Sequence, residues 1–150
     1  CPVGHQLYEG RWIRDTKVIN EYAAFHFGKG GDPGGSSKMY SQWITDGIYA
    51  NYLVTADKPF VTGLLDALIK NHEAWKQGNP ALHPWQRSRL LDNGLYWQVD
   101  SWEGQEFSIG GTGIRPPINS YRYGDAMAID QIAELAGRKQ LTQHYQAEAK

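Results

Sequence analysis

Three carboxylates lie close together in the sequence, next to two tryptophans. Asp100, Glu103 and Glu106 share one short stretch with Trp97 and Trp102. A carboxyl group that lies against an indole and is partly shielded from water has a raised pKa, which a general acid needs at neutral pH. The alternative is a turn whose carboxylates face the solvent. The pattern therefore indicates either a proton donor in an aromatic cleft or a solvated acidic loop.

Other residues with chemical potential are arranged less favourably. The five histidines are scattered over the chain, at His5, His26, His72, His83 and His144. No two of them have the i,i+4 spacing of a helical metal site, and His72 falls on an apolar helix face, which predicts a core residue. A G-x-S-x-G elbow is absent, and the glycine-rich run at 28–38 lacks the Lys-Ser/Thr ending of a phosphate-binding loop. We expect neither a metal nor a cofactor.

Composition narrows the class of protein. The chain has 150 residues, a net charge of −1 and a pI near 6.6, which fits one domain without the basic surface of a nucleic-acid-binding protein. No apolar run is long enough to span a bilayer, and the single cysteine, Cys1, excludes an internal disulfide. Six Trp and nine Tyr against four Phe suit a wet aromatic cleft as well as a helical core.

The apolar periodicity predicts five helices and one irregular region. The helices are expected at about 15–27, at 40–54, from Pro59 to about Trp75, at 119–136 and from Lys139 onward, with Gly137 as a C-cap. The region 78–117 lacks this periodicity, but the segments 94–100 and 106–109 could pair as a short β-ribbon. Repeated helical hairpins predict an all-α fold, either a solenoid or part of an α/α toroid. The long loop favours the toroid, whose site is built from such connections.

Both ends of the sequence suggest an incomplete domain. Cys1 is followed at once by motif-like sequence, and the last predicted helix has no C-cap signal. A lipid-modified or processed terminus would also explain Cys1. We expect a chain that is truncated at both ends.

Several segments, taken in order, resemble a known family. They are "RWIRD" at 11–15, "YSQWITDGIYANYLVTADKPFVTGLL" at 40–65, "GLYWQVDSWEGQEFS" at 94–108 and "RPPINSYRYGDAMAIDQIAELAG" at 115–137. The pattern is similar to the (α/α)6-barrel glycoside hydrolases typified by trehalase, processing α-glucosidase and mannosylglycerate hydrolase, and most to the mannosylglycerate-hydrolase-like branch. The resemblance implies an all-α, partial (α/α)6 toroid and an inverting glycosidase. It also favours a periplasmic or extracellular location.

The resemblance implies specific catalytic roles. "EGQEFS" matches the family's general-acid segment, which assigns that role to Glu106, with Asp100 as second choice. Gln105 stands where relatives have a hydrophobic residue. The family's general base lies far downstream and has no counterpart here, and a complete barrel needs about twelve helices. We therefore expect the isolated chain to carry the acid half of a site and to be inactive, with the remaining part of the same domain as its partner.

The same resemblance implies a set of sugar-binding residues. They are Arg11, Trp12, Arg14, Asp15, Trp43, Asp46, Trp97, Trp102, Arg115, Asn119 and Tyr121. Indoles stack on the apolar face of a pyranose, and Arg, Asp and Asn bond its hydroxyl groups. For Asp15 and Asn119, helix capping is an equal alternative.

Three other functions remain open. A non-catalytic carbohydrate-binding module would bind sugar without hydrolysis, and a helical-repeat scaffold would bind no sugar. A polysaccharide lyase on a similar toroid would use residues such as Tyr121, Tyr123 and Arg115 on an acidic sugar, and would release an unsaturated product that absorbs in the ultraviolet.

Overall fold

The computed structural model describes residues 3–27, 40–77, 88–100, 102–103 and 110–149. The glycine-rich run, His83, the predicted strand at 106–109 and Glu106 lie outside these ranges. The helices are α1 (Val3–Gly10), α2 (Thr16–Phe25), α3 (Ile44–Thr55), α4 (Lys58–Gly63), α5 (Leu65–Ala74), α6 (Pro116–Leu135) and α7 (Lys139–Glu148), and a ribbon consists of β1 (Trp97–Gln98) and β2 (Gly113–Ile114). No helix in the described ranges has the length and apolar character to cross a membrane.

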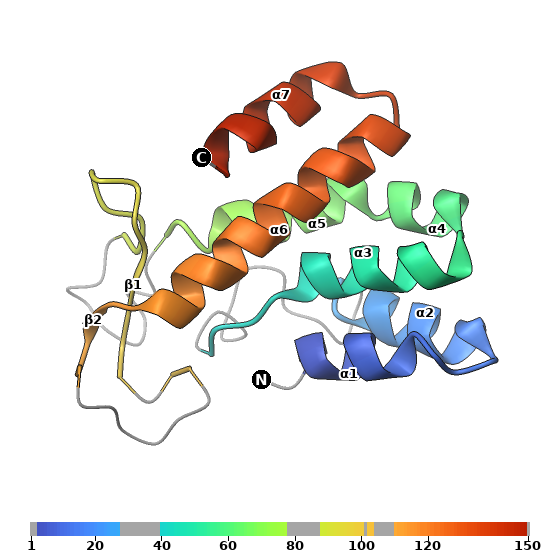
Figure 1. Ribbon diagram of the computed structural model, residues 1–150, viewed down its shortest axis with the longest axis horizontal. Coiled ribbons are helices and arrows are strands. Elements are labelled where there is room, and N and C mark those ends of the chain that lie inside the picture. The colour runs from blue at the N-terminus through green and yellow to red at the C-terminus, as the bar shows by residue number, and fades with distance from the viewer. Residues whose placement is uncertain (1–2, 28–39, 78–87, 101, 104–109, 150) are drawn as a thin grey trace.

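Three helices, α1, α3 and α6, run in the same direction (Figure 1). Gly4 near the start of α1 lies against Trp43, and Gly47, one turn further along α3, lies against Leu7. On the other side of α3, Trp43 contacts Tyr121, with ring centroids 4.4 Å apart. Because residue numbers rise together along all three helices, their N-terminal ends meet at one end of the molecule.

The return helices α5 and α7 run parallel to each other and opposite to α6. Asp66 pairs with Arg138 near the start of α5 and α7, and Lys76 pairs with Glu148 just past the end of α5. Arg122 in the first half of α6 lies 4.7 Å from the ring of Trp75, at the end of α5. The elements in the described ranges thus form three hairpins, α1–α2, α3–α4/α5 and α6–α7 (Figure 1). This all-α arrangement confirms the predicted partial toroid.

The core lies where the apolar faces of these hairpins meet. It contains Val3, Leu7, Ile19, Ala23, Ile44, Ile48, Val61, Leu65, Leu68, Ala126, Ile129, Ile132, Ala133 and Tyr145. The helix predicted from Pro59 to about Trp75 supplies several of these side chains in an apolar stripe that begins at Val61, and Trp75 itself is buried in a second cluster with Tyr96 and Ile118. Burial of these faces is the main term that stabilises helices as short as these.

Helix ends follow the capping chemistry in the sequence. Asp15 accepts a hydrogen bond from Lys17 N (3.1 Å) and caps α2, which was one of the two alternatives that the sequence left open for it. At the end of α6, Gly137 has φ +73°. The backbone N–H groups of Gly137 and Arg138 donate to Glu134 O and Ala133 O, both at 2.9 Å. This is a Schellman motif, so the predicted C-cap is confirmed.

The structure differs from the sequence prediction in four places. Helix α1 was not predicted, α3 begins at Ile44 rather than near residue 40, and the third predicted helix is split at Leu64 into α4 and α5. Helix α6 begins at Pro116, because proline fits the first turn of a helix. Strand β1 pairs antiparallel with β2, with Trp97 opposite Ile114; the predicted partner segment 106–109 lies outside the described residues.

Truncating the core should cost more stability than truncating the surface of the same helix. Ile129 is fully buried in α6, and Met127 is 36% exposed. We expect Ile129→Ala to lower the free energy of unfolding by about 2–4 kcal/mol, because it removes buried methyl groups and leaves a cavity. Urea denaturation measures this loss. Met127→Ala is the control, and equal losses in both variants would contradict the assigned core.

Candidate functional site

Six of the residues predicted to act on sugars gather at the end where α3 and α6 begin. They are Trp43, Asp46, Asp100, Trp102, Arg115 and Tyr121. Trp43 directly precedes α3, and Arg115 directly precedes α6. Trp102 O accepts a hydrogen bond from Ser41 N (2.8 Å), which joins the acidic loop to the segment before α3.

Arg115 is the centre of this gathering and is 8% exposed. Its Nε donates to Glu103 Oε2 at 2.5 Å, and its Nη1 lies 3.2 Å from Asp100 Oδ1. The same Nη1 donates to the carbonyl oxygen of Gly111. One guanidinium therefore holds three points of the chain between residues 100 and 111.

Glu103 serves the structure of this end. Its side chain is 1% exposed, and Oε1 accepts a hydrogen bond from Ile118 N at 3.0 Å. A carboxylate at this position satisfies a free N–H group in the first turn of α6 and is favoured by the helix dipole. Sequence reasoning placed Glu103 in the acidic loop but gave no sign of this capping role, because the contact depends on the fold.

Asp100, the second choice for the general acid, has an environment that suits another task. Its side chain is 15% exposed and pairs with Arg115, and its backbone N–H donates to Thr112 Oγ1 at 3.0 Å. The geometry therefore fits Asp100 for holding the loop or accepting hydrogen bonds better than for donating a proton.

An aromatic row crosses the ends of the three parallel helices. The ring of Trp43 lies 4.4 Å from Tyr121 and meets His5 edge-on at 4.7 Å. Burial, together with the charge of Glu103, raises the pKa of Tyr121. The indole also lies against Gly4, where an added Cβ would be 2.5 Å from its Cε2. Sequence reasoning set His5 aside with the other histidines, since its place beside Trp43 depends on α1.

Asp46 links all three helices beneath this row. It accepts a hydrogen bond from Tyr8 Oη at 2.6 Å, and its backbone N–H donates to Asp125 Oδ1 at 3.0 Å. Burial of Tyr8 and its bond to Asp46 raise the pKa of the phenol to about 12. Neither Tyr8 nor Asp125 was among the predicted site residues, and no motif in the sequence marks them.

The structure does not place the "RWIRD" segment at the end of the molecule where α3 and α6 begin. Trp12, Arg14 and Asp15 are exposed and follow the far end of α1, about 12 Å along its axis from Gly4 and Trp43. Arg11 lies between the two regions, with its guanidinium 4.7 Å from the ring of Tyr8 and 5.0 Å from that of Trp12.

Two further predicted residues have structural contacts. Trp97 Nε1 donates to Ser88 O at 2.7 Å. The amide of Asn119 accepts from Tyr96 N and donates to Tyr96 O, both at 2.8 Å, and also donates to Arg115 O. Asn119 lies inside the first turn of α6, whose N-cap is Arg115, so the capping alternative for Asn119 is wrong. Its amide instead links the segment before β1 to α6 through two hydrogen bonds to the backbone of Tyr96.

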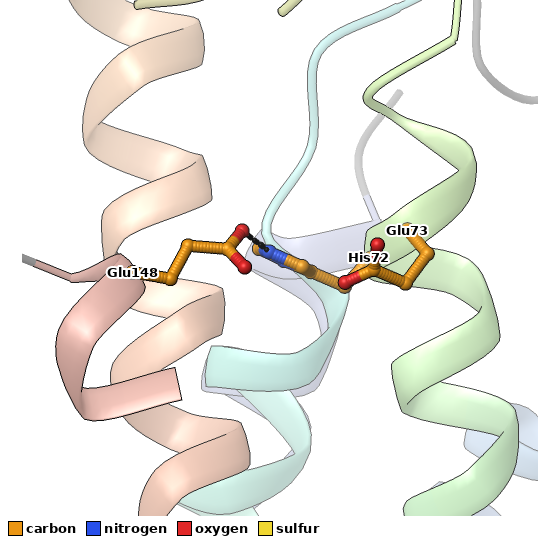
Figure 2. Close-up of side chains that lie close together, drawn as sticks. All are labelled: His72, Glu73 and Glu148. Carbon is orange, nitrogen blue, oxygen red and sulfur yellow. Dashed lines mark hydrogen bonds and ion pairs between the residues drawn. The ribbon is translucent and has the colours of Figure 1, made fainter. Parts of the chain in front are cut away.

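A second group of ionisable side chains joins α5 to α7 (Figure 2). His72, Glu73 and Glu148 have ligand-type atoms within 4.8 Å of one another. His72 Nε2 lies 2.7 Å from Glu148 Oε1. Lys76 Nζ donates to Glu148 Oε2 (2.8 Å) and to Glu73 Oε1 (2.9 Å). Because the Lys76 ammonium already bonds to both carboxylates, we interpret this group as an ion-pair network between helices. His72 is fully buried, as predicted for a core residue.

The network should make stability depend on acid pH. Burial alone would raise the pKa of Glu148, but hydrogen bonds from His72 and Lys76 outweigh it and lower this pKa to about 2. A depressed pKa in the folded state stabilises the fold above the ordinary value of 4.5 and loses this effect as the pH falls toward 2. We expect a loss of about 2 kcal/mol between about pH 5 and pH 3.

Urea denaturation across this pH range measures the loss. Glu148→Gln should flatten the pH dependence, while Glu134→Gln, an exposed acid on α6, should leave it as in the wild type. An unchanged slope in Glu148→Gln would contradict the network.

Comparison with known proteins identifies the family of this chain. Residues 1–150 match the model of a family described as "Mannosylglycerate hydrolase MGH1-like glycoside hydrolase domain". A solved structure named "Sialidase" has 34% sequence identity and a TM-score of 0.84 over 98% of this chain. This chain spans 13% of the length of that structure. No curated protein matches. The resemblance seen in the sequence is confirmed, and the chain belongs to the MGH1-like glycoside hydrolase family.

Proposed function

We propose that this chain carries the general-acid half of the active site of an inverting glycoside hydrolase that acts on an oligo- or polysaccharide. Family membership gives the class of reaction. The bonds that Arg115 makes are the observation that supports this location of the site. Its guanidinium contacts both Glu103 and Gly111, which precede and follow Glu106 in the sequence.

Glu106 remains the proposed proton donor. It lies outside the described residues, three positions after Glu103. Three residues of chain span at most about 11 Å, and Arg115 holds Glu103 at the start of α6, which supports this assignment. The neighbouring acids are occupied: Glu103 caps α6, and Asp100 pairs with Arg115.

The neighbouring side chains suit a bound sugar. Trp43 and Tyr121 form a half-buried aromatic surface on which the apolar face of a pyranose can stack. Asp46, one turn into α3, has the acceptors to bond sugar hydroxyls. Trp12, Arg14 and Asp15 lie away from this surface, so we assign them no part in this subsite.

Inversion requires a second carboxylate that activates water. In inverting glycosidases the two carboxyl groups are roughly 6.5–9.5 Å apart. We place the base in another part of the same catalytic domain, since the resemblance puts it far downstream of the acid. The 150 residues alone are then inactive, and the rest of the domain is their obligate partner.

Replacing the proposed acid should separate binding from hydrolysis. In the intact protein, with a substrate found by reducing-sugar release from a glycan panel, we expect Glu106→Gln to lower kcat by about 10²–10⁴-fold, because proton donation to the leaving group is lost. Calorimetric titration should show the sugar affinity retained. Glu9→Gln, an exposed acid on α1, is the control.

Other outcomes of this experiment would assign a different function. A product that absorbs in the ultraviolet would identify a lyase. Sugar binding that is unchanged by Glu106→Gln, without hydrolysis by the wild type, would identify a binding module. Full turnover by residues 1–150 alone would contradict the divided site.

The stereochemical course tests inversion separately. We expect the first sugar released to have the opposite anomeric configuration to the bond that was cleaved, because water attacks the face away from the leaving group. Proton NMR of the anomeric signals in the first minutes, before mutarotation, measures this. Retention of configuration would exclude the inverting mechanism while leaving the hydrolase intact.

A further inference from the structure

Two arginines are buried against the same tryptophan, outside the proposed sugar site. Arg89 is 0% exposed and Arg122 is 3% exposed. Their Cζ atoms lie 4.9 Å and 4.7 Å from the ring centroid of Trp75. Arg89 is held by its backbone: its N–H donates to Lys76 O at 3.0 Å, and its carbonyl accepts from Trp97 N at 3.1 Å. The pair is therefore fixed between α5, β1 and α6.

These guanidinium groups carry more N–H donors than there are hydrogen-bond acceptors around them. Arg122 Nη2 pairs with Asp125 Oδ2 at 2.9 Å and donates to Gln42 O, but its Nε and Nη1 have no hydrogen-bond partner. All three side-chain nitrogens of Arg89 are buried without a hydrogen-bond partner. Within the described part of the chain, Asp125 is the one carboxylate paired with either arginine.

This imbalance is costly for a buried charge. Burial and the charge of Arg122 lower the pKa of Arg89 to about 10, which leaves this side chain a cation at neutral pH. Desolvating an ion costs several kcal/mol, and buried charges are normally paired and hydrogen-bonded. Cation–π contact with Trp75 offsets part of this cost. Asp125 supplies one negative charge for the two arginines, so the pair still lacks one negative charge.

A hollow of about 740 Å³ opens beside Arg122. Its walls include Arg122, Tyr96, Lys76 and Leu90, the neighbour of Arg89. Tyr96 is 5% exposed, and its hydroxyl is a further buried donor without a hydrogen-bond partner. Glu148 also lines the hollow, but its two oxygens are already bonded to His72 and Lys76. The hollow thus adds donors rather than the missing acceptor.

We propose that Arg89 and Arg122, with the hydroxyl of Tyr96, bind a carboxylate. A carboxylate matches the planar fork of a guanidinium with two parallel hydrogen bonds, and it supplies the negative charge that the pair lacks. The carboxylate belongs either to an acidic sugar of a glycan or to an Asp or Glu side chain from another part of the intact protein. This inference does not depend on Glu106 or on hydrolysis.

The test uses the intact protein at constant pH and ionic strength. Sodium glucuronate is the carboxylate probe, and glucose is the neutral control. If the carboxylate comes from a sugar, glucuronate at about ten times its Kd should raise Tm by a few degrees, while glucose should not. Arg89→Met, which keeps the length of the side chain and removes its charge, should abolish the rise. Arg14→Met, at an exposed arginine, should keep it.

A crystal structure of the wild type soaked in glucuronate separates the two sources and does not depend on the folding of a variant. A glucuronate oxygen within about 3.2 Å of an Arg89 nitrogen supports the sugar source. An Asp or Glu side-chain oxygen at that distance, with no effect of glucuronate on Tm, supports the protein source. Arg89 nitrogens that contact only neutral groups would overturn the proposal. So would Arg89→Met of wild-type stability with no effect of glucuronate.

Discussion

The contact between Asp125 and the first turn of α3 fixes the arrangement on which the rest of the structure depends. The carboxylate of Asp125 is fully buried, accepts from Asp46 N and pairs with Arg122, which in turn donates to Gln42 O. These bonds set the register between α3 and α6. With that register, Trp43 meets Tyr121, and Arg115 at the start of α6 lies where it can hold the acidic loop. The site is thus a consequence of how two parallel helices are aligned along their axes.

Much of this fold could be predicted from local sequence signals. The apolar stripe from Val61 to Trp75, the cap at Asp15 and the glycine at 137 act within one helix, so periodicity and capping rules suffice. Helix α1 was missed because "VGHQLYEG" is short and begins and ends near glycines. It is stabilised by Val3 and Leu7 in the shared core, which is a tertiary effect. The partner of β1 likewise depends on where α6 begins.

The candidate site was predictable in its residue types more than in its geometry. Trp43 and Tyr121 are far apart in the sequence, and only the family resemblance indicated that both belong to one site. The sequence could not show which acid of the loop has a structural role, because the role of Glu103 depends on its contacts with Ile118 N and Arg115 in the folded chain. It also grouped Trp12 with Trp43, although spacing along the chain does not tell at which end of a hairpin a residue lies. The buried arginines left no signal, since arginine is usually a surface residue.

The glycine beneath Trp43 has a consequence for recognition. With no room for a Cβ at Gly4, the indole rests directly on the backbone of α1 and is held from the sides by His5 and Tyr121. Its rotamer is therefore fixed in the free protein. A planar partner that docks on this ring does not have to freeze a mobile side chain, so less conformational entropy is lost on association and the complex is preorganised.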